Sequence, residues 1–448
     1  MQIICSNNSV KTFLEEEHFD RTKKYKVSIF IVSLSLGDDV LLYNTLTKTL
    51  IAIQHEVWDY IQNGNFDKIE NYSELQKLIS EHFVVPTVLD ETNLYLELYM
   101  LVRQLADSYK GIDRYNILTT TACNARCFYC FEKGIRPIHM TKEIAVGVAK
   151  FIESTCTKQK PIHLRWFGGE PLVNRNVINI ICQSMKKSNI DFYSTMSSNG
   201  LLLSGTVIKT AKELWNMKSV RVSLDGFAEE HNKRKNYYTT GDHFSKTIQN
   251  LHSLVENNIK ANIRLTIDHN NINCMLDLSK WLVKEFGKTP MVSIYTRCIF
   301  DEVSAEKAKF NKKQVDMLVN KEREIDEWLN EHGVYDSSRI SPIGFNNYFC
   351  AANNPHAVVI SPEGYLCSCE SVNDSTQYWG DIWNGETNSE AHNMWLYGQI
   401  RKKCVNCNFL PVCTPFDRCG IDYYNCRKKN EYLHRWYMKE QFSSIVHC

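Results

Sequence analysis

Three cysteines within eight residues carry the clearest chemistry in this chain. Cys123, Cys127 and Cys130 lie in the run Cys-Asn-Ala-Arg-Cys-Phe-Tyr-Cys. A four-iron, four-sulfur (4Fe–4S) cluster normally takes four thiolates, one for each iron. Three closely spaced cysteines would bind three irons and leave the fourth iron open to a small molecule. The spacing therefore predicts a cluster with one open coordination site.

Two other uses of these cysteines stay open on spacing alone. Positions 123, 127 and 130 follow the i, i+4, i+7 pattern of one helix face, and free cysteine is often buried. Three thiols also suit zinc. Residues 115–120 have the pattern of a strand, and Thr121 and Asn124 are poor residues for a helix interior. We therefore expect the cysteines to lie on a loop that follows a strand.

A second motif lies about forty residues further on. The run His163-Leu-Arg-Trp-Phe-Gly-Gly-Glu-Pro-Leu predicts a strand that ends in a glycine turn. Two glycines let backbone carbonyls approach an ammonium group, and the carboxylate of Glu170 would complete its partners. A Gly-Gly-Glu turn alone is common. Downstream of the cysteine motif it becomes a strong indication of a binding site.

Together the two motifs resemble those of the radical SAM superfamily, whose signature is CxxxCxΦC followed by GGE. Tyr129 fills the aromatic place before the last cysteine. The resemblance implies a 4Fe–4S cluster that binds S-adenosylmethionine (SAM) and cleaves it to a radical. It further implies that Tyr129 packs near the adenine of SAM. By the same resemblance, Gly168, Gly169 and Glu170 bind the amino group of its methionine part.

Composition limits the other possibilities. The chain has 448 residues, 43% of them hydrophobic and 23% charged, and a formal net charge of +1. These values are typical of a globular protein and give no charge field that would attract nucleic acid or an anionic membrane. No apolar run approaches the ~20 residues that span a bilayer, and the first residues lack a signal-peptide pattern. We expect a cytoplasmic protein with neither nucleic acid nor membrane as a partner.

From about residue 112 to 300, predicted strands alternate with helices, which indicates βαβ units and a parallel sheet. The resemblance implies a partial (β/α)6 barrel of α/β class, with its site at the carboxyl ends of the strands. The predicted strands are 115–120, 162–167, 191–196, 220–224, 262–268 and 292–296.

Four further residues lie at these strand ends. Ser198 belongs to Ser-Ser-Asn-Gly, Ser223 and Asp225 belong to Ser-Leu-Asp-Gly, and Arg264 lies on the fifth strand. In the superfamily, residues at such positions contact the ribose and the carboxylate of SAM. Hydroxyls and short carboxylates suit ribose, and a guanidinium suits a carboxylate. Each could equally be part of an ordinary turn or ion pair.

Residues 1–108 predict short strands followed by helices, a winged-helix-like module. The arrangement is similar to the peptide-recognition domain fused in front of many radical SAM peptide maturases. That domain binds a leader peptide by adding a strand to a sheet edge. The alternative is a domain that only shields the barrel.

The C-terminal region holds a second group of cysteines, and seventeen cysteines in a chain without secretory features favour metal ligation over disulfides. Their order resembles the SPASM extension, which holds two auxiliary 4Fe–4S clusters. The resemblance assigns Cys404, Cys407, Cys413 and Cys426 to an outer cluster. It assigns Cys350, Cys369 and Cys419 to an inner cluster. The fourth iron of that cluster is either bound by Cys367 or left open. Five residues separate Cys413 from Cys419 where the family has three, and structural zinc is the alternative.

Glu370 directly follows Cys369. In the related anaerobic sulfatase maturases, an aspartate follows the matching cysteine and is proposed to accept a proton. Glu370 is therefore a candidate catalytic residue, and a solvated surface glutamate is the simpler interpretation.

These features predict three parts: a recognition domain at 1–108, a radical SAM barrel at 109–335 and a SPASM domain at 336–448. The predicted function is radical modification of a ribosomally made precursor peptide, through a thioether or carbon–carbon cross-link. Formylglycine generation and peptide epimerisation are alternatives within the same chemistry, and a zinc-stabilised binding protein without redox chemistry is an alternative of another class. The expected partners are a precursor peptide with its leader and an electron donor such as flavodoxin or ferredoxin.

Overall fold

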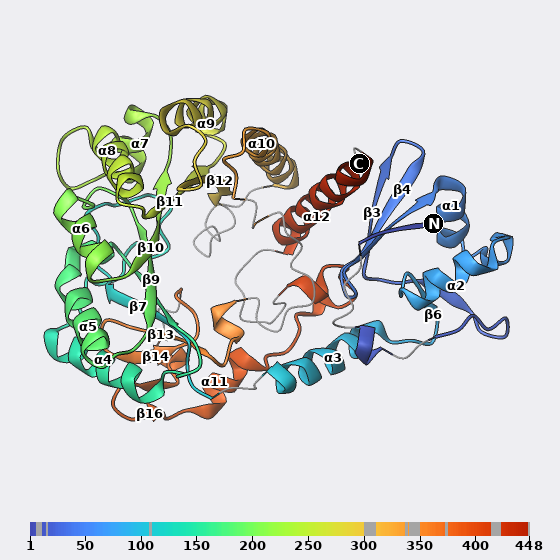
Figure 1. Cartoon of the computed structure of the whole chain (residues 1–448), viewed down its shortest axis with the longest axis horizontal. Helices are drawn as coiled ribbons and strands as arrows, with labels where there is room; N and C mark the ends of the chain where they lie inside the picture. Colours follow the sequence, from blue (N-terminus) through green and yellow to red (C-terminus); the bar gives the residue numbers. More distant parts are fainter. Residues whose placement is uncertain are drawn as a thin grey trace.

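The computed structural model describes residues 1–5, 11–14, 17–106, 110–299, 311–336, 339, 350–371, 375–413 and 423–446. The chain forms two lobes, one built on a large sheet and one on a small N-terminal sheet (Figure 1). Predicted cluster ligand Cys419 and the side chain of Cys426 lie outside this description.

The large sheet has ten strands in the order β12-β11-β10-β9-β8-β7-β13-β14-β15-β16. Neighbours among its first six strands are parallel, and the pairing of β7 with β13 is also parallel. The six strands predicted from sequence are all present, with bounds that differ by at most three residues. They are β7 (Arg114–Thr120), β8 (Ile162–Gly168), β9 (Phe192–Ser198), β10 (Met217–Leu224), β11 (Lys260–Ile267) and β12 (Val292–Cys298).

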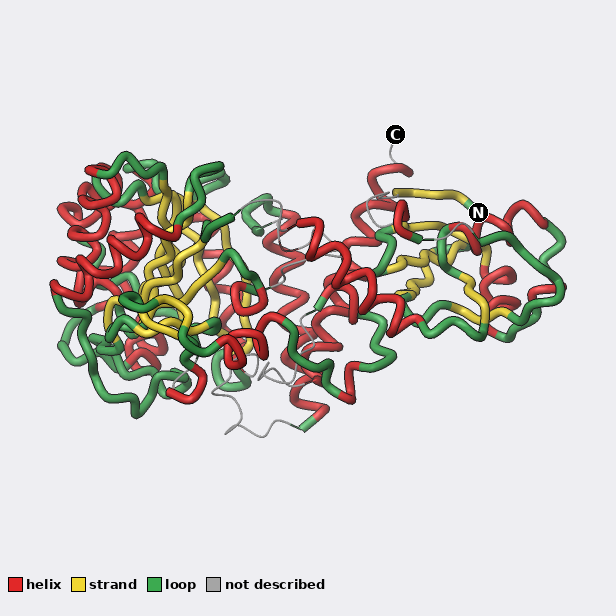
Figure 2. The backbone as a smooth tube through the Cα atoms, turned by 90° about the horizontal axis from the view of Figure 1, so that it is seen from below, coloured by secondary structure: helices red, strands yellow, loops and turns green. Residues whose placement is uncertain are grey.

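Helices cover one side of this sheet (Figure 2). Their apolar faces pack against every second residue of the strands, and this contact forms the largest hydrophobic core in the described part of the chain. Thr141 and Asp242 cap two of them by accepting a hydrogen bond from a backbone N–H of the first turn. The helices are α4 (Lys142–Thr155), α5 (Arg175–Lys187), α6 (Gly205–Glu213), α7 (Ala228–Lys235), α8 (His243–Glu256), α9 (Ile272–Phe286) and α10 (Lys312–Glu331).

Four short strands extend the sheet beyond β7, and the pairing is antiparallel from β13 onward. They are β13 (Ala357–Ile360), β14 (Tyr365–Cys367), β15 (Gly380–Asp381) and β16 (Gly385–Glu386), followed by α11 (Ser389–Leu396). These strands, which the sequence did not predict, place Cys367 at the end of β14. The C-terminal cysteine region therefore shares one sheet with the barrel strands.

The small sheet has the order β1-β5-β4-β3, so β1 and β3 form its edges among the described strands. One face packs on α1 and α2, and the other packs on α12 and on residues near 409–412. The elements of this lobe are β1 (Gln2–Cys5), β2 (Tyr25–Val27), β3 (Ile31–Leu36), β4 (Asp39–Asn44), β5 (Thr49–Gln54), α1 (His55–Gln62), α2 (Tyr72–Ser80), β6 (Val84–Pro86), α3 (Glu91–Ala106) and α12 (Tyr423–Val446). No helix in the described ranges has both the length and the apolarity to cross a membrane.

Candidate functional site

The cysteine motif lies on a loop that directly follows β7, as predicted. Residues 121–131 contain no helix, so the helix-face interpretation of the three cysteines is wrong. Backbone hydrogen bonds tie the loop to the end of α7. The Arg126 N–H donates to the Lys235 carbonyl at 2.9 Å, and the Tyr238 N–H donates to the Asn124 carbonyl at 3.1 Å. The loop is thereby fixed over the carboxyl ends of β7 and β10.

The glycine turn after β8 packs directly against the start of this loop. Gly168 has φ +115°, a conformation that side chains rarely adopt, and a Cβ there would lie 2.2 Å from the Thr120 carbonyl oxygen. A Cβ on Gly169 would lie 2.4 Å from the Ala122 carbonyl oxygen. The N–H groups of Gly169 and Glu170 donate to those same two carbonyls. Both glycines are therefore required for two backbones to meet beneath the cysteines.

Glu170 is fully buried and joins the ends of β8 and β9. Its oxygens accept hydrogen bonds from the Ser198 hydroxyl at 2.9 and 3.1 Å, the Asn199 N–H at 2.8 Å and the Leu172 N–H at 3.2 Å. Burial raises the pKa of Glu170 to about 7, although these hydrogen bonds oppose the shift. Glu170 and Ser198, both predicted to bind SAM, thus lie together and position one another. Their contact with SAM stays a prediction.

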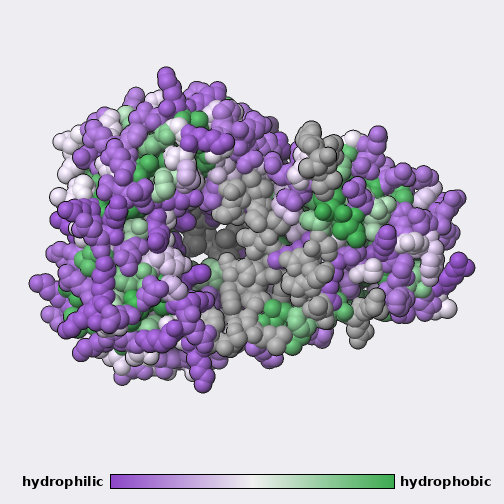
Figure 3. Space-filling model, viewed as in Figure 1, coloured by the Kyte–Doolittle hydropathy of each residue, from purple (hydrophilic) through white to green (hydrophobic). Residues whose placement is uncertain are grey.

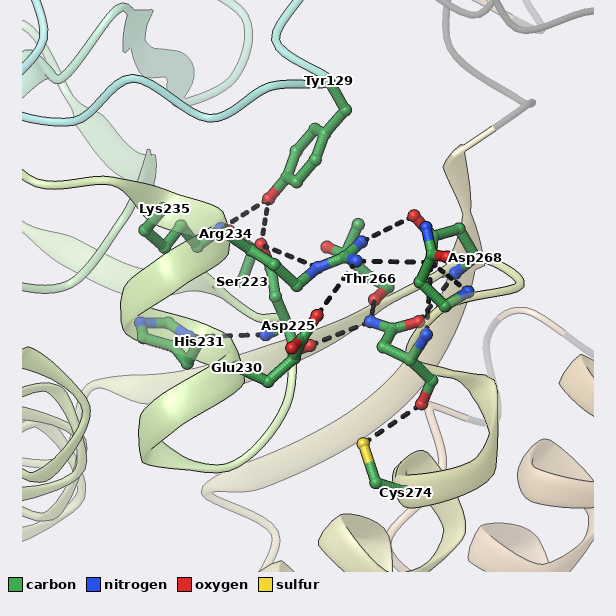
Figure 4. Close-up of polar contacts among 12 residues, drawn as sticks. Tyr129, Ser223, Asp225, Glu230, His231, Arg234, Lys235, Thr266, Asp268 and Cys274 are labelled. Carbon is green, nitrogen blue, oxygen red and sulfur yellow. Dashed lines mark hydrogen bonds and ion pairs between the residues drawn. The ribbon is translucent and has the colours of Figure 1, made fainter.

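Tyr129, Asp225 and Lys235 form a buried network beneath the cysteine loop (Figure 4). The Tyr129 hydroxyl donates to Asp225 Oδ2 at 2.6 Å, and Lys235 Nζ donates to the Tyr129 oxygen at 2.7 Å. Lys235 Nζ also lies 2.7 Å from Ser223 Oγ and 3.1 Å from Asp225 Oδ1. Burial alone would raise the pKa of Asp225, but Lys235 and its other partners hold that pKa below its ordinary value.

Arg234 continues this network toward β11. Its guanidinium forms an ion pair with Asp268 at 2.9 Å, and its Nε lies 4.0 Å from Asp225 Oδ2. The guanidinium also lies 4.9 Å from the ring centroid of Phe128 on the cysteine loop. Asn271 Nδ2 donates to the carbonyls of Asp225 and Thr266, which fixes the two strand ends relative to each other. The site is a connected polar layer across β10, β11 and the loop, in which the buried atoms Asp225 Oδ1, Arg234 Nε and Thr266 Oγ1 form no hydrogen bond with any described residue.

Sequence reasoning missed Arg234, Lys235 and Asp268. The run Lys233-Arg234-Lys235 has the composition of a solvated helix end, and α7 buries its last two members instead. The sequence did contain a signal for Arg234 and Lys235. A carboxylate that is buried at a strand end, such as Asp225, needs a cationic partner, and this basic run follows Asp225 within ten residues.

Arg264 is half-buried on β11, with Ser223 at the paired position of β10. The neighbours of Arg264 in sequence, Ile263 and Leu265, belong to the core under the helices. Because successive side chains of a strand point to opposite faces, Arg264 points away from the helices. It shares this side of the sheet with Ser223 and lies within electrostatic reach of Tyr129. Both residues therefore lie where the sequence predicted, and their contact with SAM stays a prediction.

The thiols of the first motif fit a cluster by their chemistry. Cys123, Cys127 and Cys130 form no disulfide with another described residue, are partly accessible and are carried by one loop above the glycine turn. Burial raises the pKa of the Cys123 thiol to about 12, so a bound iron would be needed to hold it as a thiolate. Within the described ranges, no three Cys, His, Asp or Glu side chains already converge as a metal-binding group. Cluster ligation thus stays a prediction that the donor set supports.

The described C-terminal cysteines fall into two places. Cys367 and Cys369 lie at and just after the end of β14. Burial raises the pKa of Cys369 to about 11 and the nearby Cys350 thiol adds to the shift, so these two predicted inner ligands are neighbours. The predicted outer ligands lie beside the small sheet, where the Thr45 hydroxyl donates to the Asn408 carbonyl at 2.6 Å. They are Cys404, Cys407 and Cys413.

Glu370 is not a solvated surface residue, so the simpler interpretation of it is wrong. Its carboxylate forms an ion pair with Arg165 of β8, on the side of the sheet that faces away from the helices. The Arg165 guanidinium also lies 5.0 Å from the ring centroid of Phe167. Glu370 therefore links the C-terminal cysteine region to the barrel. A catalytic role for it stays a prediction.

Comparison with known proteins assigns part of the chain to a family. Residues 117–282 match the family model of the radical SAM superfamily. This part of the chain forms a radical SAM domain. The matched range contains the cysteine loop, the glycine turn and the network of Figure 4.

Relatives of this chain differ in how much of it they match. A GTP 3',8-cyclase of Clostridium perfringens is 31% identical over 165 residues, 36% of this chain and 49% of the cyclase. The chain thus spans about half the length of this relative. The radical SAM cyclopropyl synthase TigE of Paramaledivibacter caminithermalis is 24% identical over 412 residues, 84% of this chain and 81% of that enzyme. A cysteine-type anaerobic sulfatase-maturating enzyme of Clostridium novyi is 24% identical over 69% of this chain and 86% of its own.

Solved structures share the fold. The enzyme anSMEcpe with bound AdoMet and the Cp18Cys peptide has a TM-score of 0.58 at 17% identity, and the match covers 75% of this chain and 99% of anSMEcpe. Streptococcus suis SuiB bound to its precursor peptide SuiA has a TM-score of 0.50 at 12% identity, covering 89% of this chain and 99% of SuiB. At these identities the likeness concerns the fold.

Proposed function

We propose that this radical SAM enzyme modifies a ribosomally made precursor peptide and forms a thioether or carbon–carbon cross-link in it. The proposal assigns residues 1–108 to leader recognition, 109–335 to the barrel and 336–448 to the auxiliary clusters. The observation that carries it is the small sheet in the order β1-β5-β4-β3, in which β3 is an edge strand in the described part of the lobe. Such an edge offers backbone groups to an added peptide strand.

Two further observations support a peptide substrate. The structural match with SuiB, which was solved with its precursor peptide SuiA, covers 89% of this chain, whereas the alignment with the GTP 3',8-cyclase covers 36%. The small sheet also packs against the region of the C-terminal cysteines, since Asn408 Nδ2 donates to the Ile31 carbonyl of β3 at 3.2 Å. A leader held at β3 would therefore lie beside the part of the chain assigned to the outer cluster.

In this proposal the residues of the site have distinct tasks. Cys123, Cys127 and Cys130 would hold the first cluster, and the C-terminal cysteines would hold two auxiliary clusters. When bound, these groups and SAM supply the 5'-deoxyadenosyl radical and an acceptor for the electron left on the substrate. Tyr129 and Asp225 hold the cysteine loop over β10, and Lys235 neutralises Asp225 so that the loop keeps its place in a buried setting.

Formylglycine generation is a second candidate, because the sulfatase-maturating enzyme matches 69% of this chain. The two functions differ in the substrate. A leader-guided enzyme requires the small N-terminal sheet, whereas oxidation of a short sulfatase segment would proceed with the barrel and cluster regions.

The test is mass spectrometry of the peptide encoded by the nearest short reading frame, after anaerobic incubation with the reconstituted enzyme, SAM and reductant. A cross-link predicts loss of two hydrogen atoms from the peptide together with formation of 5'-deoxyadenosine. The triple variant Cys123→Ala, Cys127→Ala, Cys130→Ala is the control and should form neither product. A colourless protein that binds zinc instead of iron would overturn the proposal.

A further inference from the structure

Three arginines on strands of the large sheet share its helix-free side. Each lies between two residues that are buried in the core under the helices, so each side chain points the opposite way. The arginines are Arg165 on β8, Arg221 on β10 and Arg264 on β11.

The strand register brings two of them together. Arg221 pairs with Asn262, and Arg264 pairs with Ser223. The two arginines are therefore offset by two residues on neighbouring strands, which keeps them on the same side of the sheet. Arg339 joins them, because its guanidinium lies 4.0 Å from the ring centroid of Tyr295, the residue that pairs with Arg264 on β12. Protein atoms around the Arg221 guanidinium lower its pKa by desolvation, and the charges of Arg165, Arg264 and Arg339 lower it further. These four residues form what we call the arginine group.

Arg221 is the unusual member. It lies on a central strand with β9 and β11 on its two sides, yet the residue is exposed. Figure 3 shows a hollow beside the large lobe, with hydrophilic residues on that side of its margin. Arg221 is accessible to solvent, yet the protein atoms around its guanidinium desolvate it enough to lower its pKa. An accessible but partly desolvated side chain on the helix-free side of a central strand faces a concave space.

Carboxylates lie beside two members of the arginine group. Glu370 pairs with Arg165, and the buried Asp326 lies within electrostatic reach of Arg339. No ion pair or hydrogen bond to a carboxylate is formed by Arg221 within the described ranges. Gathering like charges in a protein-lined space is unfavourable unless an anion completes it.

We propose that the arginine group binds a carboxylate of the peptide substrate, with Arg221 as its main contact. This inference rests on the proposed function and names its substrate class: a peptide with an acidic side chain or a free C-terminal carboxylate at the reacting segment. A guanidinium binds a carboxylate with two parallel hydrogen bonds. Glu370 offsets Arg165, and Asp326 lies near Arg339. With Arg264 assigned to SAM, Arg221 is left for the substrate, and one guanidinium suits a singly charged carboxylate better than a polyphosphate. The carboxylate of SAM is assigned separately to Arg264.

The test uses the full, cluster-loaded chain with SAM, kept anaerobic at physiological salt. Four pools of synthetic dodecapeptides serve as probes. They contain either Asp and Glu or Asn and Gln at the varied positions, and either a free or an amidated C-terminus. Peptides retained by the protein are quantified by mass spectrometry. The two differences between pools separate a side-chain carboxylate from a C-terminal one.

We expect the wild type to retain one kind of carboxylate-bearing pool over its neutral counterpart by roughly tenfold or more, the scale of one charge-assisted pair. Arg221→Gln should remove this preference and leave the affinity for SAM within about twofold, because Arg221 is not assigned to SAM. Lys218→Gln changes an exposed charge on the same strand and should keep the preference. Arg221→Lys, which retains the charge, should keep part of it and serves if the glutamine variant does not fold.

Three results would overturn the inference. They are an equal preference in the wild type and Arg221→Gln, no preference for carboxylates in the wild type, and binding of GTP that depends on Arg221. The precursor-peptide assay separates this outcome from failure of the proposed function. A precursor that is cross-linked equally well by Arg221→Gln would leave the peptide function in place and remove the arginine group from it.

Discussion

The Tyr129 hydroxyl donates a hydrogen bond to Asp225 Oδ2 at 2.6 Å across 96 residues of sequence. Tyr129 belongs to the cysteine loop and Asp225 to the turn after β10, so this bond joins the predicted cluster site to a strand end predicted to bind SAM. Both side chains are buried. A buried hydrogen bond to a charged group is stronger than a neutral one, and its loss leaves a charged atom without its partner.

Tyr129→Phe should therefore weaken both the fold and the site. We expect a loss of about 1–3 kcal/mol in the free energy of unfolding, measured by urea titration of the apo chain. The cluster-loaded variant should also bind SAM less tightly in equilibrium dialysis. Tyr238→Phe is the matched control, since the backbone of Tyr238 also contacts the cysteine loop while its side chain is 62% exposed. Equal behaviour of the two variants would contradict the role of Tyr129.

Lys235→Met removes the buried ammonium that contacts Tyr129, Ser223 and Asp225. Breaking a buried ion pair on one side costs about 3–5 kcal/mol, because the remaining charge is left uncompensated. Arg234, at 4.0 Å from Asp225, should reduce this loss in part. Unfolding titration measures it, with the exposed Lys233→Met on the same helix as control.

Tyr129 and Lys235 permit a double-mutant cycle, because they contact each other and share Asp225. The double variant Tyr129→Phe, Lys235→Met should lose less free energy of unfolding than the sum of the two single variants, by at least about 0.5 kcal/mol. Additive losses would mean that the two residues stabilise the chain independently.

Much of this site could be predicted from the sequence. The strands β7 to β12 are detectable because strands buried in a parallel sheet give short apolar runs separated by helical patterns. The cysteine loop and the glycine turn are detectable because their residue types are needed at fixed local spacing. Both signals depend on neighbours in the sequence.

The rest depends on contacts between distant segments. Lys235 has the local pattern of a solvated helix end, and its partner Tyr129 lies 106 residues away. The strands β13 to β16 are only two to four residues long and form by pairing with β7 and one another. Likewise, α12 packs on a sheet formed by the first residues of the chain. Patterns of a few residues cannot specify such pairings.

Gly169→Ala should disturb the cysteine loop without touching a cysteine. The added Cβ would lie 2.4 Å from the Ala122 carbonyl oxygen, so one of the two backbones must shift. We expect less iron to be bound after anaerobic reconstitution and a lower thermal midpoint, with a loss of about 1–3 kcal/mol. Gly205→Ala is the control, because a Cβ there meets nothing within 4 Å. Full iron loading of Gly169→Ala would show that the turn does not position the loop.

His434 should make the contact between α12 and the small sheet sensitive to acid. Its ring is buried, with centroids 5.1 Å from the Phe409 ring and 5.7 Å from the Tyr43 ring. Burial lowers the pKa of His434 from its ordinary 6.5 to about 4. The folded chain thus keeps this histidine neutral between these values while the unfolded chain takes up a proton. Its contribution to stability is complete above pH 6.5 and falls as the pH drops toward 4, by up to about 1.4 kcal/mol per pH unit.

Urea unfolding of the apo chain between pH 7 and 4 measures this effect, because without iron no cluster is lost in acid. Hydrogen exchange of α12 should rise over the same interval. His434→Phe, which keeps an aromatic ring in the contact, should have a smaller loss of stability in acid than the wild type. The exposed His332→Phe should behave like the wild type. Desolvation also lowers the pKa of His82, His163 and His231, so the difference between His434→Phe and the wild type measures the part of the acid response that belongs to His434. An unchanged acid response in His434→Phe would show that this histidine does not control the docking of α12.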